Sequence, residues 1–399
     1  MRKTKVLVAA LLVLAGCGGN AGTAAPSNPQ PTDSTTPDAT TAPGATTTSS
    51  PERDPVEHVN VTERGATLGD VNATKVWERV DDMVDVDAEP PPVVVRPRPT
   101  EQRVTPTPFE ASFGATNATY DYTLPGGLFD TQLGRYRVVV WRPPGATDAQ
   151  VEYTLAHEFL HAHQVGVYGL SGDRDDLAAM TATEGVTEYL AWRYAEQYTD
   201  YDAEAALREL FADLPPMGRA ARAEYYFSAT YARNHTDPDA PFRSMNENRP
   251  TTAEQVLHGL APGSEPPRPL TVHGQSGNAG VFLSALVETE GEAQLRFLLQ
   301  YGLSRARAAR AAAGWGNDRV ATFRRGGSEG FAWVIRWDSR AEAREFERLF
   351  ADFDANVSEP LRLEAVGEET TVVLAGSPAF VGNATVTGTA ANVTVAAGD

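Results

Sequence analysis

The chain has 399 residues and a formal net charge of -19, from 53 acidic and 34 basic residues. Only three of the basic residues are lysines, and the others are arginines. Such a surface is typical of proteins that stay soluble in concentrated salt, where the Debye length is about 3 Å at 1 M and charge repulsion is screened. The acidic balance argues against nucleic acid as a partner, because phosphate contacts need clustered lysine and arginine.

The N-terminus has the pattern of a short export signal. Three basic residues within the first five positions precede an apolar stretch at residues 6–14, which is too short to span a membrane. The run Leu-Ala-Gly-Cys that follows resembles the lipobox of secreted lipoproteins and implies that Cys17, the only cysteine, carries a lipid. The alternative is a cysteine discarded with a cleaved peptide. We therefore expect a signal peptide at residues 1–16 and an extracellular protein that is lipid-anchored to the cell membrane.

Residues 17–55 are almost entirely small, polar and proline residues. This composition cannot bury enough apolar surface to fold, so we expect a disordered tether of the kind found in glycosylated stalks. With the lipobox and the acidic composition, it resembles haloarchaeal surface lipoproteins. Seven of the thirteen asparagines begin an Asn-x-Ser/Thr pattern, where chance predicts roughly two, which indicates N-glycan acceptors. These are Asn60, Asn72, Asn117, Asn234, Asn356, Asn383 and Asn392.

The stretch at residues 56–365 is long enough for one large domain or two small ones. Its first part mixes element types. Residues 72–84 have helical character, and residues 93–95 predict a short strand. The sequence GGLFDTQLGRYRVVVW then predicts a turn leading into a β-branched strand at residues 135–141.

The next helix carries His157, Glu158 and His161 in the pattern HEFLH. Histidines four residues apart on a helix lie one turn apart on the same face, so both imidazoles can reach one metal ion. Glu158 is rotated about 100° from His157, beside the open position of that metal, where its carboxylate can accept a proton from water. A separate apolar stripe lets the helix pack without using its histidine face. The stripe consists of Val151, Leu155, Phe159 and Ala162.

A second helix, at residues 173–197, is expected to supply the third metal ligand. Glu184 follows His161 by 23 positions, and Glu188 lies one turn further along the same helix face. We expect Glu184 to bind the metal and Glu188 to hydrogen-bond a ligating histidine, which fixes its tautomer and raises its basicity. Gly185 is expected to let the two helices approach closely.

The pattern HEFLH, then 22 residues, then EGVTE resembles that of the gluzincin metallopeptidases. The resemblance implies an α+β, zincin-like fold, in which a small twisted sheet and the active-site helix precede a mostly helical half and a C-terminal strand-helix extension. It implies Zn²⁺ bound by His157, His161 and Glu184, with Glu158 as general base. In zincins an edge strand beside the active-site helix pairs with an extended peptide substrate, and the strand at residues 135–141 is the candidate.

Further helices are expected at residues 203–214 and 217–233, and two packed helices at residues 273–302. The segments AAAGWGNDRVATFRR and FAWVIRWDSRAEAREFERLF predict two strands and a helix. These two segments, together with the segments AHEFLHAHQ and TTAEQVLH, form a series of motifs. The series resembles that of uncharacterised bacterial and archaeal lipoprotein-like metallopeptidases over about residues 70–355. The tail at residues 366–399 is rich in Val, Thr, Ala and Gly and predicts weak strands or disorder.

The residue that would stabilise the oxyanion of a peptidase is left open by the sequence. His163 lies two positions after His161 and so about 200° around the helix, which excludes it as a ligand. A tyrosine or histidine usually donates to the developing oxyanion. The candidates are Tyr225, Tyr226, His235, His258 and His273.

The sequence thus predicts a surface-anchored zinc metallopeptidase that acts on a peptide or protein substrate. No phosphate-binding loop, GxSxG elbow or catalytic cysteine is present. The main alternative is a non-catalytic surface lipoprotein that keeps a zincin fold as a structural or binding module. A glycan hydrolase is a weaker alternative, because no second acidic pair has glycosidase-like placement. A distance above about 5 Å from Glu184 to the two histidine nitrogens would exclude zinc bonds of about 2 Å and with them the enzyme.

Overall fold

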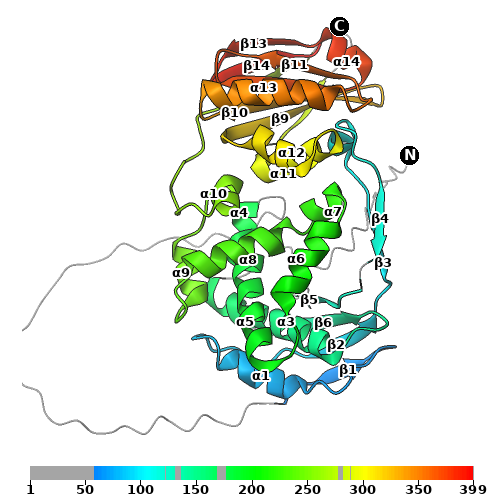
Figure 1. Ribbon diagram of the computed structural model, residues 1–399, viewed down its shortest axis with the longest axis vertical. Coiled ribbons are helices and arrows are strands. Elements are labelled where there is room, and N and C mark those ends of the chain that lie inside the picture. The colour runs from blue at the N-terminus through cyan, green and yellow to red at the C-terminus, as the bar shows by residue number, and fades with distance from the viewer. Residues whose placement is uncertain are drawn as a thin grey trace, which may run out of the picture.

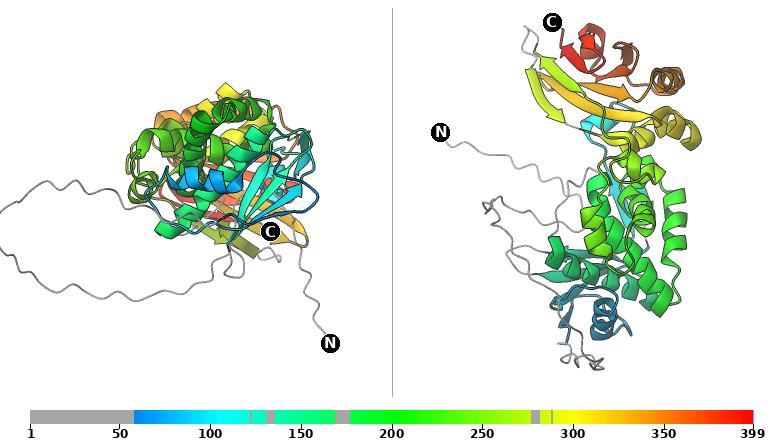
Figure 2. Two further views of the ribbon diagram at one scale, coloured as in Figure 1. Left: turned by 90° about the horizontal axis from the view of Figure 1, so that it is seen from below. Right: turned by 90° about the vertical axis from the view of Figure 1, so that its left-hand side faces the viewer.

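The computed structural model describes residues 58–121, 123–130, 136–168, 177–276, 282–287 and 289–398. The expected signal peptide, Cys17 and the tether lie outside these residues. The described part is elongated, with a small sheet at one end, helices in the middle and larger sheets at the end that carries the C-terminus (Figures 1 and 2). Helices and strands are therefore combined in separate layers, as the α+β class predicts. No helix in the described ranges is both long and apolar enough to cross a bilayer.

The small sheet has four strands in the order β1-β2-β6-β5. Strands β1, β2 and β6 are parallel, and β5 is antiparallel to β6. Four of their valines and Phe129 join the core of the helical part; the valines are Val93, Val95, Val138 and Val140. The strands are β1 (Val61–Glu63), β2 (Val93–Pro97), β5 (Gly126–Asp130) and β6 (Arg137–Arg142).

The edge strand of this sheet is not the one predicted. Strand β6, which covers most of residues 135–141, is internal, since it pairs with β2 on one side and with β5 on the other. Strand β5 lies at the edge and pairs only with β6 in the described part of the chain. The sequence does not distinguish them, because both are short apolar runs and strand order depends on pairing between distant segments.

The middle layer is helical and packs around the long helix α3 (Asp148–Tyr168). The predicted helix at residues 72–84 is found as α1, where the Asn72 side chain accepts a hydrogen bond from the Lys75 N–H and caps the helix. The apolar stripe of α3 is buried, as predicted from its spacing. The other helices are α1 (Ala73–Asp81), α4 (Leu177–Met180), α5 (Val186–Tyr198), α6 (Ala203–Asp213), α7 (Pro216–Ala220), α8 (Ala223–His235), α9 (Pro241–Glu247) and α10 (Ala253–His258), with a π-helical turn η2 (Thr181–Gly185).

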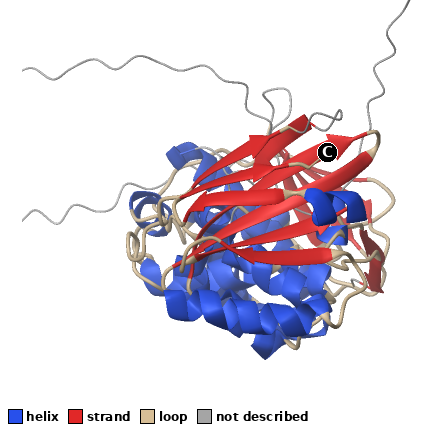
Figure 3. Cartoon of the chain, turned by 90° about the horizontal axis from the view of Figure 1, so that it is seen from above, coloured by secondary structure: helices blue, strands red, loops and turns tan. Residues whose placement is uncertain are grey.

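The C-terminal part is built on a five-stranded sheet in the order β11-β12-β10-β9-β8. Viewed from this end, its strands lie over the helices (Figure 3). Trp333 and Ile335 of β10 belong to the core on one face, and Ala332 and Val334 belong to the core on the other. Both faces are covered, which explains the nearly continuous apolar run of β10. The strands are β8 (Phe282–Val287), β9 (Trp315–Arg325), β10 (Ser328–Trp337), β11 (Leu361–Ala365) and β12 (Thr370–Gly376).

Helices cover one face of this sheet and a three-stranded sheet, ordered β13-β14-β7, covers the other. The C-terminal part is therefore larger than the strand-helix extension that the sequence predicts. The helices on the first face are α11 (Gly291–Leu298), α12 (Arg305–Ala312), α13 (Arg340–Asp354) and the 3-10 turn η3 (Leu299–Tyr301), whereas α14 (Pro378–Asn383) packs on the face of the three-stranded sheet. The strands are β7 (Thr271–Gln275), β13 (Thr385–Thr389) and β14 (Asn392–Ala396).

Two expectations for this part need correction. Residues 282–287 form strand β8 rather than a helix, because this apolar run pairs with β9, and a short apolar run has no periodicity that separates the two structures. The mostly helical half therefore ends at α10, before β7 and β8. For residues 366–399 the sequence predicts weak strands or disorder, and strands are found. Strand β12 is buried over almost its whole length.

One early segment leaves the first sheet and reaches the C-terminal core. It contains the hairpin β3 (Glu101–Val104) and β4 (Ala118–Asp121), with the short helix α2 (Pro108–Ala111) between the strands. Phe109 and Phe113 pack edge-on against Trp333, with ring centroids 5.3 and 5.5 Å away. This contact ties the two ends of the molecule together.

Candidate metal centre

The HEFLH segment lies in the buried middle of α3. His157 and Glu158 are 7% and 3% exposed, and His161 is fully buried. Imidazole and carboxylate groups are costly to bury unless each finds a partner. The contacts of these side chains therefore show what the site can hold.

Glu184 lies in the π-helical turn η2, between α4 and α5. π-Helical turns are rare and occur frequently at functional sites. Gly185 allows a close approach, although not the one expected, because a Cβ at this position would lie 2.6 Å from the Cβ of Ser228 on α8. The glycine thus brings α8, rather than α3, against the turn that carries Glu184.

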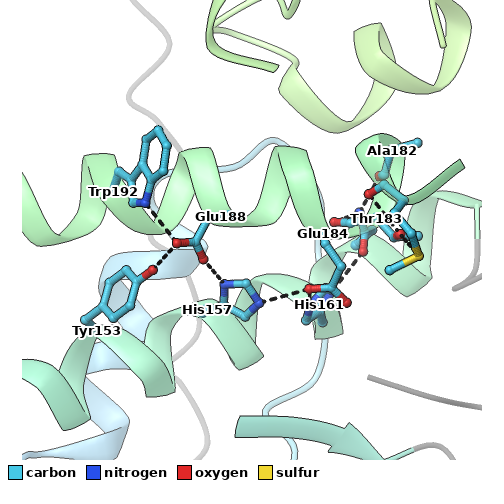
Figure 4. A network of polar contacts seen from close by, with 10 residues as sticks. Tyr153, His157, His161, Ala182, Thr183, Glu184, Glu188 and Trp192 are labelled. Carbon is cyan, nitrogen blue, oxygen red and sulfur yellow. Dashed lines mark hydrogen bonds and ion pairs between the residues drawn. The ribbon is translucent and has the colours of Figure 1, made fainter. Parts of the chain in front are cut away.

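The structure brings His157, His161 and Glu184 together (Figure 4). Oε2 of Glu184 lies 3.4 Å from Nε2 of His157 and 3.4 Å from Nε2 of His161. Zinc bonds of about 2.0–2.2 Å in a tetrahedral site place neighbouring donor atoms roughly 3.3–3.5 Å apart. The three side chains therefore fit a zinc ion, and the separation is well inside the limit of about 5 Å that would exclude one.

The tautomer of His161 is set by Gln164, one turn along α3. The Gln164 amide nitrogen donates to the carbonyl oxygens of Ala182 and Thr183, at 2.8 and 3.1 Å, so its oxygen faces Nδ1 of His161 at 2.9 Å. Nδ1 must then carry the proton, and Nε2 presents a lone pair. The buried Nε2 of His161 and Oε2 of Glu184 have no hydrogen-bond partner. Two facing acceptors are unfavourable without a cation between them.

Glu188 holds His157 from the side opposite Glu184 (Figure 4). Its Oε2 lies 3.0 Å from Nδ1 of His157, so Nε2 of His157 also points toward Glu184. Its Oε1 accepts hydrogen bonds from the Tyr153 hydroxyl and from Nε1 of Trp192. Glu188 is thus fixed at both oxygens, as a carboxylate behind a metal-binding histidine commonly is.

The pKa values reflect the same electrostatics in the metal-free protein. Burial lowers the pKa of His157, but the nearby carboxylates of Glu184 and Glu188 outweigh it and hold that pKa well above the usual value. Burial raises the pKa of Glu184, but the two histidines outweigh it and keep the pKa of that carboxyl well below its usual range. The cluster therefore favours an anionic Glu184 that attracts a cation.

Glu158 lines a pocket beside the histidines, under the edge strand β5. A Cβ at Gly127 would lie 2.1 Å from Oε1 of Glu158, so only glycine lets the strand cross this carboxylate. Glu158 therefore sits between α3 and a strand whose outer edge pairs with no other described strand. An extended peptide paired to β5 would lie next to this carboxylate.

Tyr225 of α8 is the only one of the five oxyanion candidates that lines this pocket. Its ring centroid lies 6.2 Å from that of His157, and the guanidinium of Arg222 lies 5.6 Å from the Tyr225 ring centroid. The other four are elsewhere: Tyr226 stacks on Phe211, His235 stacks on Tyr231, His258 contacts Glu292 and His273 is an exposed residue of β7.

His163 is outside the site, as its position on the helix predicts. Its ring stacks on Trp77 with centroids 4.5 Å apart, and its Nδ1 lies 2.8 Å from the carbonyl oxygen of Val86. Burial lowers its pKa, which favours the neutral ring in this packed position. His163 therefore has a structural role.

Several residues around the site were not identified from the sequence. Gln164, Tyr153 and Trp192 orient the ligands or their carboxylate partner, and Arg222 lines the pocket. A usable signal existed for three of them, because Gln164 lies three residues after His161, Tyr153 four before His157 and Trp192 four after Glu188. Arg222 precedes α8 and has no such spacing.

Comparison with known proteins covers only the C-terminal part. A family described as "Domain of unknown function (DUF8575)" matches residues 284–399, which include β9 to β14 but none of the metal-centre residues. No curated protein and no solved structure matches the chain.

Proposed function

We propose that the protein is a zinc-dependent metallopeptidase. The observation that carries the proposal is the convergence of three buried ligand atoms, Nε2 of His157, Nε2 of His161 and Oε2 of Glu184, with Gln164 and Glu188 on the far sides of the two rings. Zinc bound there would supply a Lewis acid for the peptide carbonyl and lower the pKa of a water molecule. The zincin-like fold and the relation to gluzincins belong to this proposal.

The protein's own residues would perform the proton transfers and position the substrate. Glu158 accepts the proton of the attacking water and donates it to the leaving amine. Strand β5 pairs with the peptide backbone at the edge where Gly127 passes over Glu158. Tyr225, with Arg222 beside it, donates to the oxyanion as the tetrahedral centre forms.

The first test is zinc stoichiometry together with recovery of activity. The metal-stripped full-length protein in concentrated salt is expected to bind about one zinc and to regain cleavage of an unfolded protein when zinc is added. His161→Gln should lose both, whereas His273→Gln, a control at an exposed position, should keep both. Zinc binding without cleavage would instead favour the alternative, a zinc-stabilised binding module.

We also propose, from the sequence, that the enzyme is held at the cell surface by a lipid on Cys17 and carries N-linked glycans. The seven candidate asparagines are all exposed residues, which leaves each accessible to modification. Membrane-fraction partitioning of wild type and Cys17→Ser tests the anchor. The wild type should enter the detergent phase and the variant should not, and equal partitioning would contradict the anchor.

A further inference from the structure

A second cluster of carboxylates lies far from the histidines, where α10 meets the C-terminal sheet. Glu254 lies on α10, Glu265 on the loop before β7, and Asp338 between β10 and α13. One oxygen from each residue can be chosen so that no two lie more than 4.8 Å apart. Glu254 and Glu265 are 11 residues apart, but Asp338 follows Glu265 by 73 residues, so the fold itself brings the third carboxylate to the cluster.

The buried member of the cluster has no partner. Glu254 is 4% exposed, and no hydrogen bond or ion pair of its carboxylate is found within the described part of the chain. Glu342, in the first turn of α13, adds a carboxylate oxygen that is buried and also unpartnered. A buried carboxylate without a partner is strongly destabilising, and a cation bound among these oxygens would remove that cost.

The neighbouring charges do not neutralise the cluster. Glu292 is satisfied separately, since it pairs with Arg296 and His258. Arg268 packs with Asp338 against Gly316, but its guanidinium pairs with Glu369 at 3.0 Å.

Two glycines make room for the acidic side chains. A Cβ at Gly314 would lie 2.3 Å from Cδ of Glu342, and a Cβ at Gly316 would lie 2.7 Å from Oδ1 of Asp338. The carboxylates therefore pack directly on the backbone on either side of Trp315. This accounts for the Gly-Trp-Gly sequence at the start of β9.

We propose that Glu254, Glu265 and Asp338, with Glu342 beside them, bind a calcium ion. The donors are all carboxylate oxygens, which calcium prefers and zinc does not require. Calcium bonds of about 2.4 Å allow ligand oxygens to lie up to roughly 4.8 Å apart, whereas magnesium bonds of about 2.1 Å demand a tighter cage. The site is independent of the proposed zinc centre.

The calcium ion would lock the helical part of the molecule to the C-terminal part. Glu254 and Glu265 precede the segment matched to the domain of unknown function, and Asp338 and Glu342 lie inside it. The bound ion thus bridges two segments with separate hydrophobic cores. Its expected effect is on the stability of the whole protein rather than on the reaction.

The test is thermal unfolding of the metal-stripped full chain, reloaded with one equivalent of zinc, as CaCl₂ is added at constant ionic strength. Wild type should gain on the order of 5 °C at saturation. Glu254→Gln should show almost no gain and should be at least as stable as wild type without calcium, because it replaces a buried carboxyl group that has no partner with a neutral amide. Asp338→Asn provides a second variant with the same expected loss.

Glu209→Gln serves as the matched control, because it removes an exposed carboxylate from α6 and should keep the calcium response. Terbium in place of calcium should give luminescence sensitised by Trp315, and Glu254→Gln should abolish it. No calcium shift in wild type, an equal shift in Glu254→Gln, or an equal shift with magnesium would overturn the calcium site.

Discussion

The carboxylate of Glu188 lies 3.0 Å from Nδ1 of His157, on the side of the ring opposite the nitrogen that faces Glu184. This contact fixes the tautomer that leaves Nε2 free for a metal. Glu188→Gln keeps the shape but replaces a carboxylate with an amide, so we expect zinc affinity to fall by about 10- to 100-fold. Competition titration with a chromogenic chelator measures this change. Glu196→Gln, at an exposed position of the same helix, should leave the affinity unchanged.

Gly127 controls the position of the general base. A Cβ there would overlap the carboxylate of Glu158, so Gly127→Ala must displace either Glu158 or β5. We expect cleavage to fall at least 100-fold while zinc is still bound, since a misplacement of about 1 Å can cost that much. Gly382→Ala is the control, because a Cβ at that position meets no atom within 4 Å. Equal activities of the two variants would show that Glu158 does not need this space.

Tyr225 is the expected donor to the oxyanion. Tyr225→Phe removes the hydroxyl and keeps the ring that packs near His157. The loss of one such donor lowers kcat by about 100-fold, with a smaller effect on KM, because the hydrogen bond strengthens in the transition state. Steady-state kinetics separate the two constants. If KM rises and kcat does not fall, Tyr225 binds substrate and does not stabilise the transition state.

Acid stability should depend on Asp148 at the start of α3. A hydrogen bond from the backbone N–H of Asp70 and the pair with Arg142 lower the pKa of Asp148. A lowered pKa in the folded state means that this stabilisation is present above about pH 4 and is lost as pH falls through the lowered value.

We therefore expect Asp148→Asn to lower the free energy of unfolding by about 0.5–1 kcal/mol at pH 7. The effect is small because a partly exposed ion pair contributes little more than this to stability. Urea unfolding of the zinc-free protein at pH 7 and pH 3 measures the difference, which should shrink at pH 3. An equal difference at both values would show that the charge of Asp148 is not responsible.

The elements that the sequence predicted correctly are those with local signals. The Asn72 cap, the apolar stripe of α3 and the spacing of the two histidines all depend on residues within a few positions of each other. The contact between Glu188 and His157 was also predicted from the sequence, because the helical spacing of Glu184 and Glu188 places both carboxylates on one face.

The features that were missed depend on distant pairing. The edge position of β5 is decided by which strands flank β6, and β8 becomes a strand because β9 pairs with it. The π-helical turn around Glu184 and the close packing of Gly185 on Ser228 require a neighbouring helix that no local pattern indicates. The same reason applies to Tyr225, which reaches the pocket only because α8 packs there.

The central claim is that Glu158 acts as the base of a zinc peptidase. The most direct measurement is the rate at which zinc-loaded wild type and Glu158→Gln cleave the same unfolded protein, with zinc content determined for both. We expect equal zinc content and at least a 1,000-fold lower rate for the variant, because an amide cannot accept the proton. Equal cleavage rates, or no cleavage by zinc-loaded wild type, would contradict the claim that Glu158 is the base of a zinc peptidase.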